Sequence, residues 1–216
     1  MKLLSVNVGL PREVKWDGRI IRTSIFKTPV AGRVQVRKLN IDGDQQSDLT
    51  VHGGVDKAVY VYPSEHYAFW RDALPKADLS WGAFGENLTT QGALDDKAVH
   101  IGDRFRIGST ELVVTQPRIP CYKLGIRFGR ADMVKRFLHS GRNGFYLAVA
   151  REGEVAAGDS IELMTRDENG ITIADIVELY TGDAAKQDFL QRVSELAALP
   201  ENWRAYFRKR LWKPDA

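Results

Sequence analysis

The chain has almost no cysteine, because Cys121 is the single cysteine among its 216 residues. An internal disulfide is therefore excluded, and so is a zinc site built from several thiolates. One thiolate also cannot supply the four ligands of a usual iron–sulfur cluster. Any redox reaction carried out by this chain is therefore expected to depend on a bound cofactor rather than on the chain's own side chains.

Long apolar runs are also missing, and no stretch approaches the roughly 20 residues that span a bilayer. The N-terminus carries one lysine and a short apolar stretch with no small-residue cleavage site, which predicts a first strand rather than a signal peptide. These features lead us to expect a cytoplasmic protein without a membrane partner. With 44% hydrophobic and 27% charged residues, the composition is that of a folded globular domain rather than a disordered chain.

Acidic side chains are scarce in one segment and basic side chains in the next, although the net charge of the chain is only +3. Residues 104–142 hold nine basic and two acidic side chains, whereas residues 143–200 hold four basic and eleven acidic ones. Cys121 lies in the middle of the basic segment. Neighbouring cations favour the thiolate form of a cysteine and the binding of an anionic ligand, provided that they converge in space.

The first 165 residues show many short strands that are rich in Val, Ile and aromatic residues, with Gly or Asp between them. Such a pattern predicts a mainly β fold with some α-helix, built as a closed or nearly closed barrel. Helices are expected at 64–74, after Pro63, and at 132–139, before a Ser-Gly pair. The expected strands are 2–8, 19–25, 32–39, 58–62, 99–101, 103–107, 111–116, 144–150 and 160–165.

The pattern changes after residue 166, where a polar segment that ends in glycine precedes three amphipathic stretches. They predict helices at 172–180, 184–199 and 201–211, with apolar residues at helical spacing. The sequence therefore predicts a barrel-like domain over 1–166 and a small three-helix domain over 171–216. A unit of that size is marginal alone, so it should pack on the barrel or on a partner.

Two glycine-containing motifs in the first half could bind a ligand. In the first, His52 precedes the pair Gly53-Gly54, and Asp56 and Lys57 follow; paired glycines let a backbone approach a ligand closely. The alternative is a tight loop with a surface histidine. In the second, Gly85 precedes Glu86 and Asn87; the Asn87 amide offers both a donor and an acceptor and could hydrogen-bond to the edge of a heterocycle. The alternative is a turn that enters a strand.

Two further motifs lie in and after the basic segment. Pro117 and Pro120 fix the backbone before Cys121, and the cations Arg118 and Lys123 flank it, which favours a functional thiolate over a small buried hydrophobe. Arg142 lies between two glycines and could form an anion cradle, or it could be a solvated residue after a helix end. The basic, aromatic stretch 201–211 favours an amphipathic helix over a nucleic-acid-binding surface.

Taken in order, these strings resemble the MOSC family, the domain shared by molybdenum cofactor sulfurases and related molybdenum enzymes. The matching strings are VHGGVDKAVYVYP, FGENLTT, IGDRFRIG, QPRIPCYKL and GRNGFYLAV, and the three C-terminal helices resemble the 3-alpha domain of the YiiM-type branch. The resemblance implies a β-barrel-like fold that binds molybdenum cofactor, with Cys121 as the residue that ligates molybdenum or carries sulfur. It also implies that the pterin and its phosphate are held by His52, Gly53, Gly54, Lys57, Glu86, Asn87, Arg118, Lys123 and Arg142.

The branch that the chain resembles is associated with reduction of N-hydroxylated compounds, including N-hydroxylated bases. The leading hypothesis is therefore a molybdenum-dependent reductase, with a proton supplied by His52, Asp56 or Glu86. Because no dinucleotide fingerprint is present, a separate flavoprotein or iron–sulfur protein is expected to deliver the electrons, and the acidic segment is a candidate docking surface. The alternatives are a carrier of the cofactor, or of sulfur on Cys121, and a nucleic-acid-binding barrel. A homodimer is also compatible with the sequence.

Overall fold

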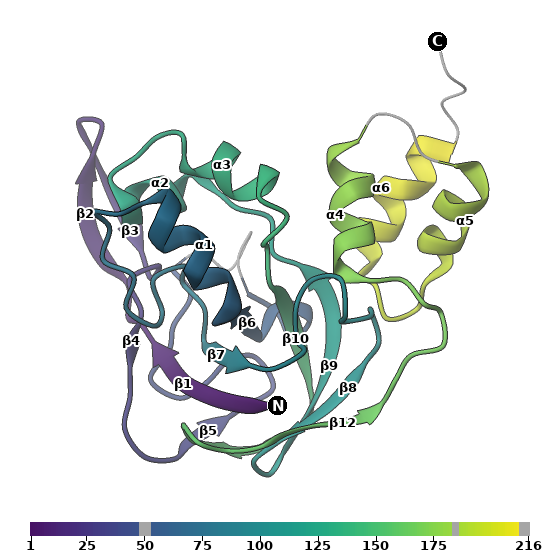
Figure 1. Ribbon diagram of the computed structural model, residues 1–216, viewed down its shortest axis with the longest axis horizontal. Coiled ribbons are helices and arrows are strands. Elements are labelled where there is room, and N and C mark those ends of the chain that lie inside the picture. The colour runs from purple at the N-terminus through teal and green to yellow at the C-terminus, as the bar shows by residue number, and fades with distance from the viewer. Residues whose placement is uncertain (48–52, 183–185, 212–216) are drawn as a thin grey trace.

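The computed structural model describes residues 1–47, 53–182 and 186–211, and in it an eight-stranded sheet has helices α1–α3 on one side and α4–α6 on the other (Figure 1). The strands of this sheet follow the order β12-β8-β9-β10-β6-β7-β1-β4, and β6 and β7 run parallel. Two strand pairs, β5 with β11 and β2 with β3, lie outside it. The elements are β1 Lys2–Val8, β2 Arg12–Trp16, β3 Arg19–Thr23, β4 Thr28–Pro29, β5 Val34–Val36, η1 Val55–Lys57, β6 Val59–Pro63, α1 Glu65–Ala73, β7 Leu88–Gln91, β8 Arg104–Ile107, β9 Thr110–Pro117, α2 Tyr122–Phe128, α3 Met133–His139, β10 Phe145–Arg151, β11 Gly153–Val155, β12 Ile161–Thr165, α4 Ile173–Thr181, α5 Gln187–Glu195 and α6 Glu201–Leu211.

The sheet curls toward a barrel because the chain before β12 returns to the first strand. The backbone N–H of Leu3 donates to the carbonyl of Asp159, and that of Ile161 donates to the carbonyl of Met1, both at 2.9 Å. Between β1 and β12, both of which are described in full, the contact is an isolated bridge from Lys2 to Ser160 rather than a strand pair. The predicted barrel-like, mainly β fold is therefore confirmed, although the barrel is not fully closed.

Alternation along the paired strands β9 and β10 fills the interior of the curled sheet. In β9, Leu112 and Val114 are fully buried, and in β10, Leu147 and Val149 are buried to within 1%. Successive side chains of a strand point to opposite faces, so this period of two sends one face inward. Each such side chain contributes about 1.5–3 kcal/mol through burial. These strands therefore give a firm base to the loop that follows β9.

Helices α1 and α3 are fixed to the outside of β6 by a cluster of large aromatic side chains. The Trp70 indole donates a hydrogen bond to the Tyr62 hydroxyl at 2.7 Å, and its ring stacks on Phe137 with centroids 5.7 Å apart. Phe84 packs between them, 4.6 Å from the ring of Tyr62. Aromatic pairs of this kind add about 0.5–1.5 kcal/mol beyond the area that they bury.

The C-terminal helices form a bundle that shares one hydrophobic core with the sheet. A capping box starts α4, in which Thr172 and Asp175 each bond the other's backbone N–H. The Trp203 indole of α6 donates to the Gln116 side chain of β9 at 2.7 Å, inside the protein. This hydrogen bond therefore fixes the bundle to β9, the strand that leads into the Cys121 loop.

Several predicted elements differ from the observed ones. The segment 99–101 is not a strand: Ile101 donates to the carbonyl of Ile171, and Ile173 donates to that of Val99, so its buried apolar residues hold the start of α4. The predicted strand 32–39 contains only the three residues of β5. The predicted helix 184–199 is observed as Gln187–Glu195, with residues 183–185 outside the described part. Helix α2 and strands β2, β4, β7 and β11 were not predicted.

No helix within the described ranges is long and apolar enough to cross a membrane.

Candidate functional site

A pocket with a cavity volume of about 110 Å³ lies where β9 runs into the Cys121 loop. It gathers seven residues that the sequence motifs singled out, from segments far apart in the chain: Gly53, Lys57, Gly85, Asn87, Arg118, Cys121 and Lys123. Lys27, which follows β3, also lines this pocket and belongs to none of the sequence motifs. Among the described residues, four cationic side chains and one thiol therefore share a small volume, and we call it the cationic pocket.

Cys121 is a half-buried cysteine that immediately precedes α2. Its extended backbone, with φ −114° and ψ 171°, follows Pro120, and its carbonyl accepts the N–H of Leu124 at 3.0 Å. The helix it precedes ends at Gly129 in the left-handed conformation. A glycine at that position is the usual helix stop and is the signal that could have predicted α2.

Arg118 is the least exposed of the four cations in the pocket, with 6% of its surface exposed. Its backbone N–H donates to Gly144 at 3.1 Å, and its guanidinium lies 4.8 Å from the centre of the Phe137 ring. Its Nη1 is buried, and among the described residues it has no hydrogen-bond acceptor. A buried unsatisfied donor on a charged group costs free energy, and an anionic ligand in the pocket would recover it.

Three other polar residues of the pocket have protein partners. The Lys123 ammonium, also buried, donates to the Ser47 hydroxyl at 3.0 Å. Lys27 forms an ion pair with Asp44, and burial lowers the pKa of Lys27. The Asn87 amide accepts the N–H of Tyr60 at 3.1 Å and donates to Asp44 at 2.9 Å, so it holds the pocket's wall as well as lining it.

The first glycine motif reaches the cationic pocket only in part. Gly53 and Lys57 line it, and burial lowers the pKa of Lys57 despite the nearby Asp56 carboxylate. Gly54 and Asp56 do not line it; the carbonyl of Asp56 accepts hydrogen bonds from the side chains of Thr115 and Gln116 instead. The predicted role of His52 falls outside the described residues.

Glu86 does not line the pocket, although the sequence placed it among the cofactor-binding residues. Its carboxylate is fully buried and accepts the backbone N–H groups of Gly82 and Phe84 at 2.8 and 3.1 Å. The hydroxyls of Thr89 and Tyr67 also donate to it. Burial raises the pKa of Glu86. Glu86 thus stabilises the turn that carries Asn87, and its carboxylate oxygens are occupied by these protein donors.

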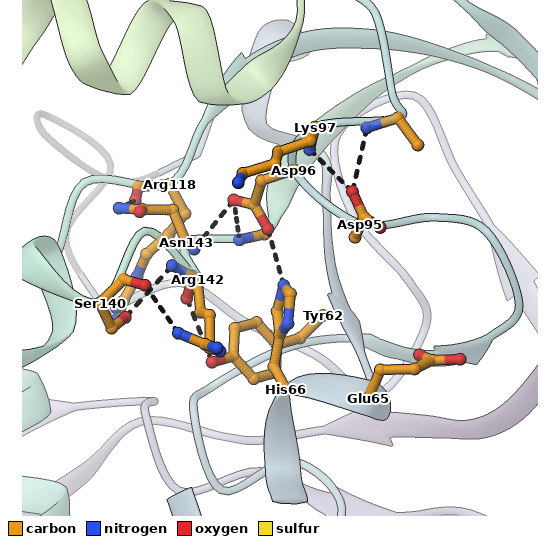
Figure 2. Close-up of polar contacts among 12 residues, drawn as sticks. Tyr62, Glu65, His66, Asp95, Asp96, Lys97, Arg118, Ser140, Arg142 and Asn143 are labelled. Carbon is orange, nitrogen blue, oxygen red and sulfur yellow. Dashed lines mark hydrogen bonds and ion pairs between the residues drawn. The ribbon is translucent and has the colours of Figure 1, made fainter. Parts of the chain in front are cut away.

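Arg142 also lies away from the cationic pocket. Its guanidinium donates to the carbonyl of Ser140 at 2.8 Å (Figure 2). It also lies 4.0 Å from the centre of the Phe69 ring. The glycines around it shape the loop, but the side chain faces α1 rather than the cations. Of the alternatives weighed for this motif, the structure thus shows a residue after a helix end that is held by local contacts.

A buried carboxylate supports the loop that holds Arg118. Asp96 accepts the N–H groups of Asn143 and Gly144 at 2.9 and 3.0 Å, and its other oxygen lies 2.7 Å from His66 Nε2 (Figure 2). The Asn143 amide in turn donates to the carbonyl of Arg118 at 3.0 Å. The backbone carbonyl of Asp96 accepts the N–H of Ala174 in α4. One residue thus links α1, the Arg118 loop and the three-helix bundle.

Substitution of Asp96 with asparagine should destabilise the protein by about 2–3 kcal/mol, because the amide has one acceptor oxygen in place of two. It can keep the two backbone N–H groups of Asn143 and Gly144 but loses the charged carboxylate oxygen that faces His66. The neighbouring Asp95→Asn is a matched control: Asp95 is exposed, and within the described part of the chain its carboxylate accepts only the N–H groups of Lys97 and Ala98 in its own turn (Figure 2). Its loss should cost about 1 kcal/mol or less. Chemical denaturation of both variants measures the difference, and equal losses would contradict a special role for Asp96.

Comparison with known proteins agrees with the fold. Residues 48–162 match the MOSC domain family, and residues 171–213 match the YiiM-like, 3-alpha helix domain. The chain is 44% identical to the Bacillus subtilis protein YflK over 96% of this chain and 93% of that one. The crystal structure of YiiM from Geobacillus stearothermophilus is similar at a TM-score of 0.82 and 34% identity, covering 97% of this chain and 98% of that chain. A Gibberella moniliformis protein named reductase is 36% identical over 76% of this chain, which is 29% of that protein.

The chain belongs to the MOSC-domain family. Within it, the chain has the YiiM-like arrangement, in which the MOSC domain is followed by the three-helix domain.

Proposed function

We propose that this chain is a molybdenum-cofactor-dependent reductase of N-hydroxylated compounds. The observation that carries the proposal is the pairing of Cys121 with the buried cation Arg118 in one pocket, where Arg118 Nη1 has no acceptor among the described residues. Membership of the MOSC family and a fungal relative named reductase support the same class of enzyme. The finer assignment, to N-hydroxylated substrates, follows the resemblance to the YiiM-type branch.

The residues of the cationic pocket fit such a cofactor. A phosphate-bearing pterin is anionic, and Arg118, Lys123 and Lys57, which line the pocket, could donate hydrogen bonds to it. A soft thiolate such as Cys121 suits molybdenum and is a poor ligand for magnesium or calcium. When bound, the cofactor would supply the two-electron chemistry, and the chain would supply position and charge.

The overall reaction consumes two electrons and two protons: the N–O bond of R–NH–OH breaks, and R–NH2 and water are formed. The chain fixes the Cys121 loop through Pro117, Pro120 and the Asp96 network, so that the thiolate would need little rearrangement. Because Glu86 is held within its own turn, it is a poor proton donor to a pocket ligand. We propose that protons enter from solvent or from the segment containing His52 and Asp56.

The electrons are proposed to come from a separate flavoprotein or iron–sulfur protein that docks on the acidic segment 143–200. Exposed carboxylates of that segment include Glu178 and Glu195 on the three-helix bundle. Charge reversal there should slow turnover with the protein donor and leave turnover with dithionite unchanged. Equal loss with both reductants would show that the segment is not a docking surface.

Metal and pterin analysis of the chain made in a cofactor-producing host tests the proposal, with Cys121→Ala alongside. The wild type should contain molybdenum and pterin and be reoxidised by an N-hydroxylated substrate. The variant should lose about 100-fold or more in activity, since it lacks the assigned metal ligand. A wild type with cofactor but without substrate-dependent reoxidation would instead be a carrier. Salt-sensitive oligonucleotide binding without molybdenum would favour the nucleic-acid alternative.

A further inference from the structure

A second, larger cavity of about 400 Å³ lies between the Cys121 loop and the three-helix bundle. On its barrel side it shares four residues with the cationic pocket: Lys57, Ile119, Cys121 and Tyr146. On its other side it is lined by Tyr180 of α4 and by Asn202, Trp203 and Tyr206 of α6. We call this cavity the interdomain groove. Occupants of the groove and of the cationic pocket would both contact Cys121.

The wall that the bundle contributes is aromatic and well fixed. The Tyr180 ring lies 5.4 Å from that of Trp203 and 5.7 Å from that of Tyr206, measured between centroids. Trp203 is 7% exposed, and its indole is held by Gln116 of the barrel. Tyr180 and Tyr206 are 37% and 39% exposed, so substantial parts of them remain accessible on a rigid support.

The two cavities differ in chemistry. Lys27, Arg118 and Lys123 line the cationic pocket and do not line the groove, where Lys57 is the one basic or acidic side chain among the described lining residues. An anionic group is therefore favoured in the pocket, and an uncharged one in the groove. Flat aromatic rings gain from offset or edge-to-face contacts with tyrosine and tryptophan. The groove thus suits a neutral, planar ligand rather than a phosphate.

From these features we infer that the interdomain groove is the substrate subsite, and that Tyr180 and Tyr206 select ring-bearing N-hydroxylated substrates over small aliphatic ones. The inference rests on the proposed reductase function for the reaction, but the ring-binding itself does not require turnover. It gives the three-helix bundle a direct role: it completes the site beside Cys121, which the barrel alone leaves open on that side.

The binding test uses adenine, a planar heteroaromatic base with no N–O bond to reduce, and calorimetry on the full-length chain. Tyr180→Leu and Tyr206→Leu should each weaken adenine binding about five- to tenfold, and the double variant should weaken it further. Tyr180→Phe and Tyr206→Phe, which keep the rings, should bind within about twofold of the wild type. Melting temperatures check that the leucine variants are folded, as expected for two partly exposed side chains. Adenine binding that is equally tight in the double leucine variant would overturn the assignment.

The kinetic test compares an N-hydroxylated purine with N-methylhydroxylamine. In the leucine variants KM should rise for the purine and remain unchanged for the aliphatic compound, with kcat nearly constant for both. Parallel changes for both substrates would overturn the selectivity. If the chain holds no molybdenum but still binds adenine through the two tyrosines, the reductase proposal fails while the groove stands as a ring-binding site. If the enzyme is active and the tyrosines have no effect, the groove assignment alone fails.

Discussion

Replacing Arg118 with methionine should lower the affinity for an anionic cofactor by about 100-fold or more, while leaving the cofactor-free protein at least as stable. Arg118 is buried, and its Nη1 has no acceptor among the described residues, so the free protein bears an uncompensated cost. Methionine keeps much of the length and the contact with Phe137 but removes the charge. A ligand that depends on charge-assisted hydrogen bonds from this position would lose them.

Arg136→Met is the matched control for that prediction. Arg136 belongs to the same basic segment, but it is exposed on α3, where it donates to the carbonyl of Ala73 and lies near Asp132. Its loss changes the net charge equally without changing the cationic pocket. Cofactor content after purification, thermal stability of the cofactor-free protein and salt dependence of binding separate the two variants. If both lose the cofactor to the same degree, the general charge of the segment matters and the position of Arg118 does not.

The sequence predicted best those parts of the fold in which local pattern and environment agree. The limits of β1 and of α6 agree with the prediction, because a short apolar run marks the first element and helical spacing of the buried Trp203 and Phe207 marks the second. The prediction of a strand at 99–101 was wrong, because a buried apolar run has the same sequence pattern whether it pairs in a sheet or supports the start of a helix. Helix α2 was missed because Gly125 lies inside it and lowers its helix propensity.

For the site, too, local sequence pattern predicted some residues correctly and others not. The basic segment and its prolines pointed to Cys121, Arg118 and Lys123, which all line the cationic pocket. Arg142 has the same local signature of a cation between glycines, yet a turn of the loop sends it to Phe69. Lys27 could not be found from a motif, because only the fold carries the β3 end to this pocket. Residue type and neighbours thus indicate chemistry, whereas the side to which a residue turns depends on distant contacts.

The same limit applies to the interdomain groove. The stretches 172–180 and 201–211 were predicted as amphipathic helices, and Trp203 of the second does lie inside. Tyr180 and Tyr206 belong to the same two helices. The two tyrosines remain more than one third exposed, because the bundle packs against β9 through Trp203 and leaves a cavity beside it. Helical periodicity identifies the apolar face of a helix but cannot show where two packed domains leave space between them.

Gly144→Ala should be the most destabilising substitution among the glycines of this loop, with a loss of about 3 kcal/mol or more. Gly144 has a φ of +63°, and a β-carbon there would lie 2.4 Å from the carbonyl oxygen of Val61 and 2.9 Å from the Tyr62 ring. Gly141 has nearly the same φ, +62°, but a β-carbon there would meet no atom of the described residues within 4 Å. Gly141→Ala should therefore cost only the left-handed strain, about 1–2 kcal/mol.

The difference between the two alanine variants isolates the contact with β6, and differential scanning calorimetry measures it as melting temperatures. With about 2–4 °C per kcal/mol for a chain of this size, Gly144→Ala should melt several degrees below Gly141→Ala. Gly144 also accepts the N–H of Arg118 and donates to Asp96, so its displacement should weaken cofactor retention as well. Equal melting temperatures would mean that β6 shifts to accommodate the added methyl group without loss of stability. Retained cofactor in a destabilised Gly144→Ala would mean that Arg118 keeps its place without this glycine, and the loop's support would then have to come from Asn143 and Phe137.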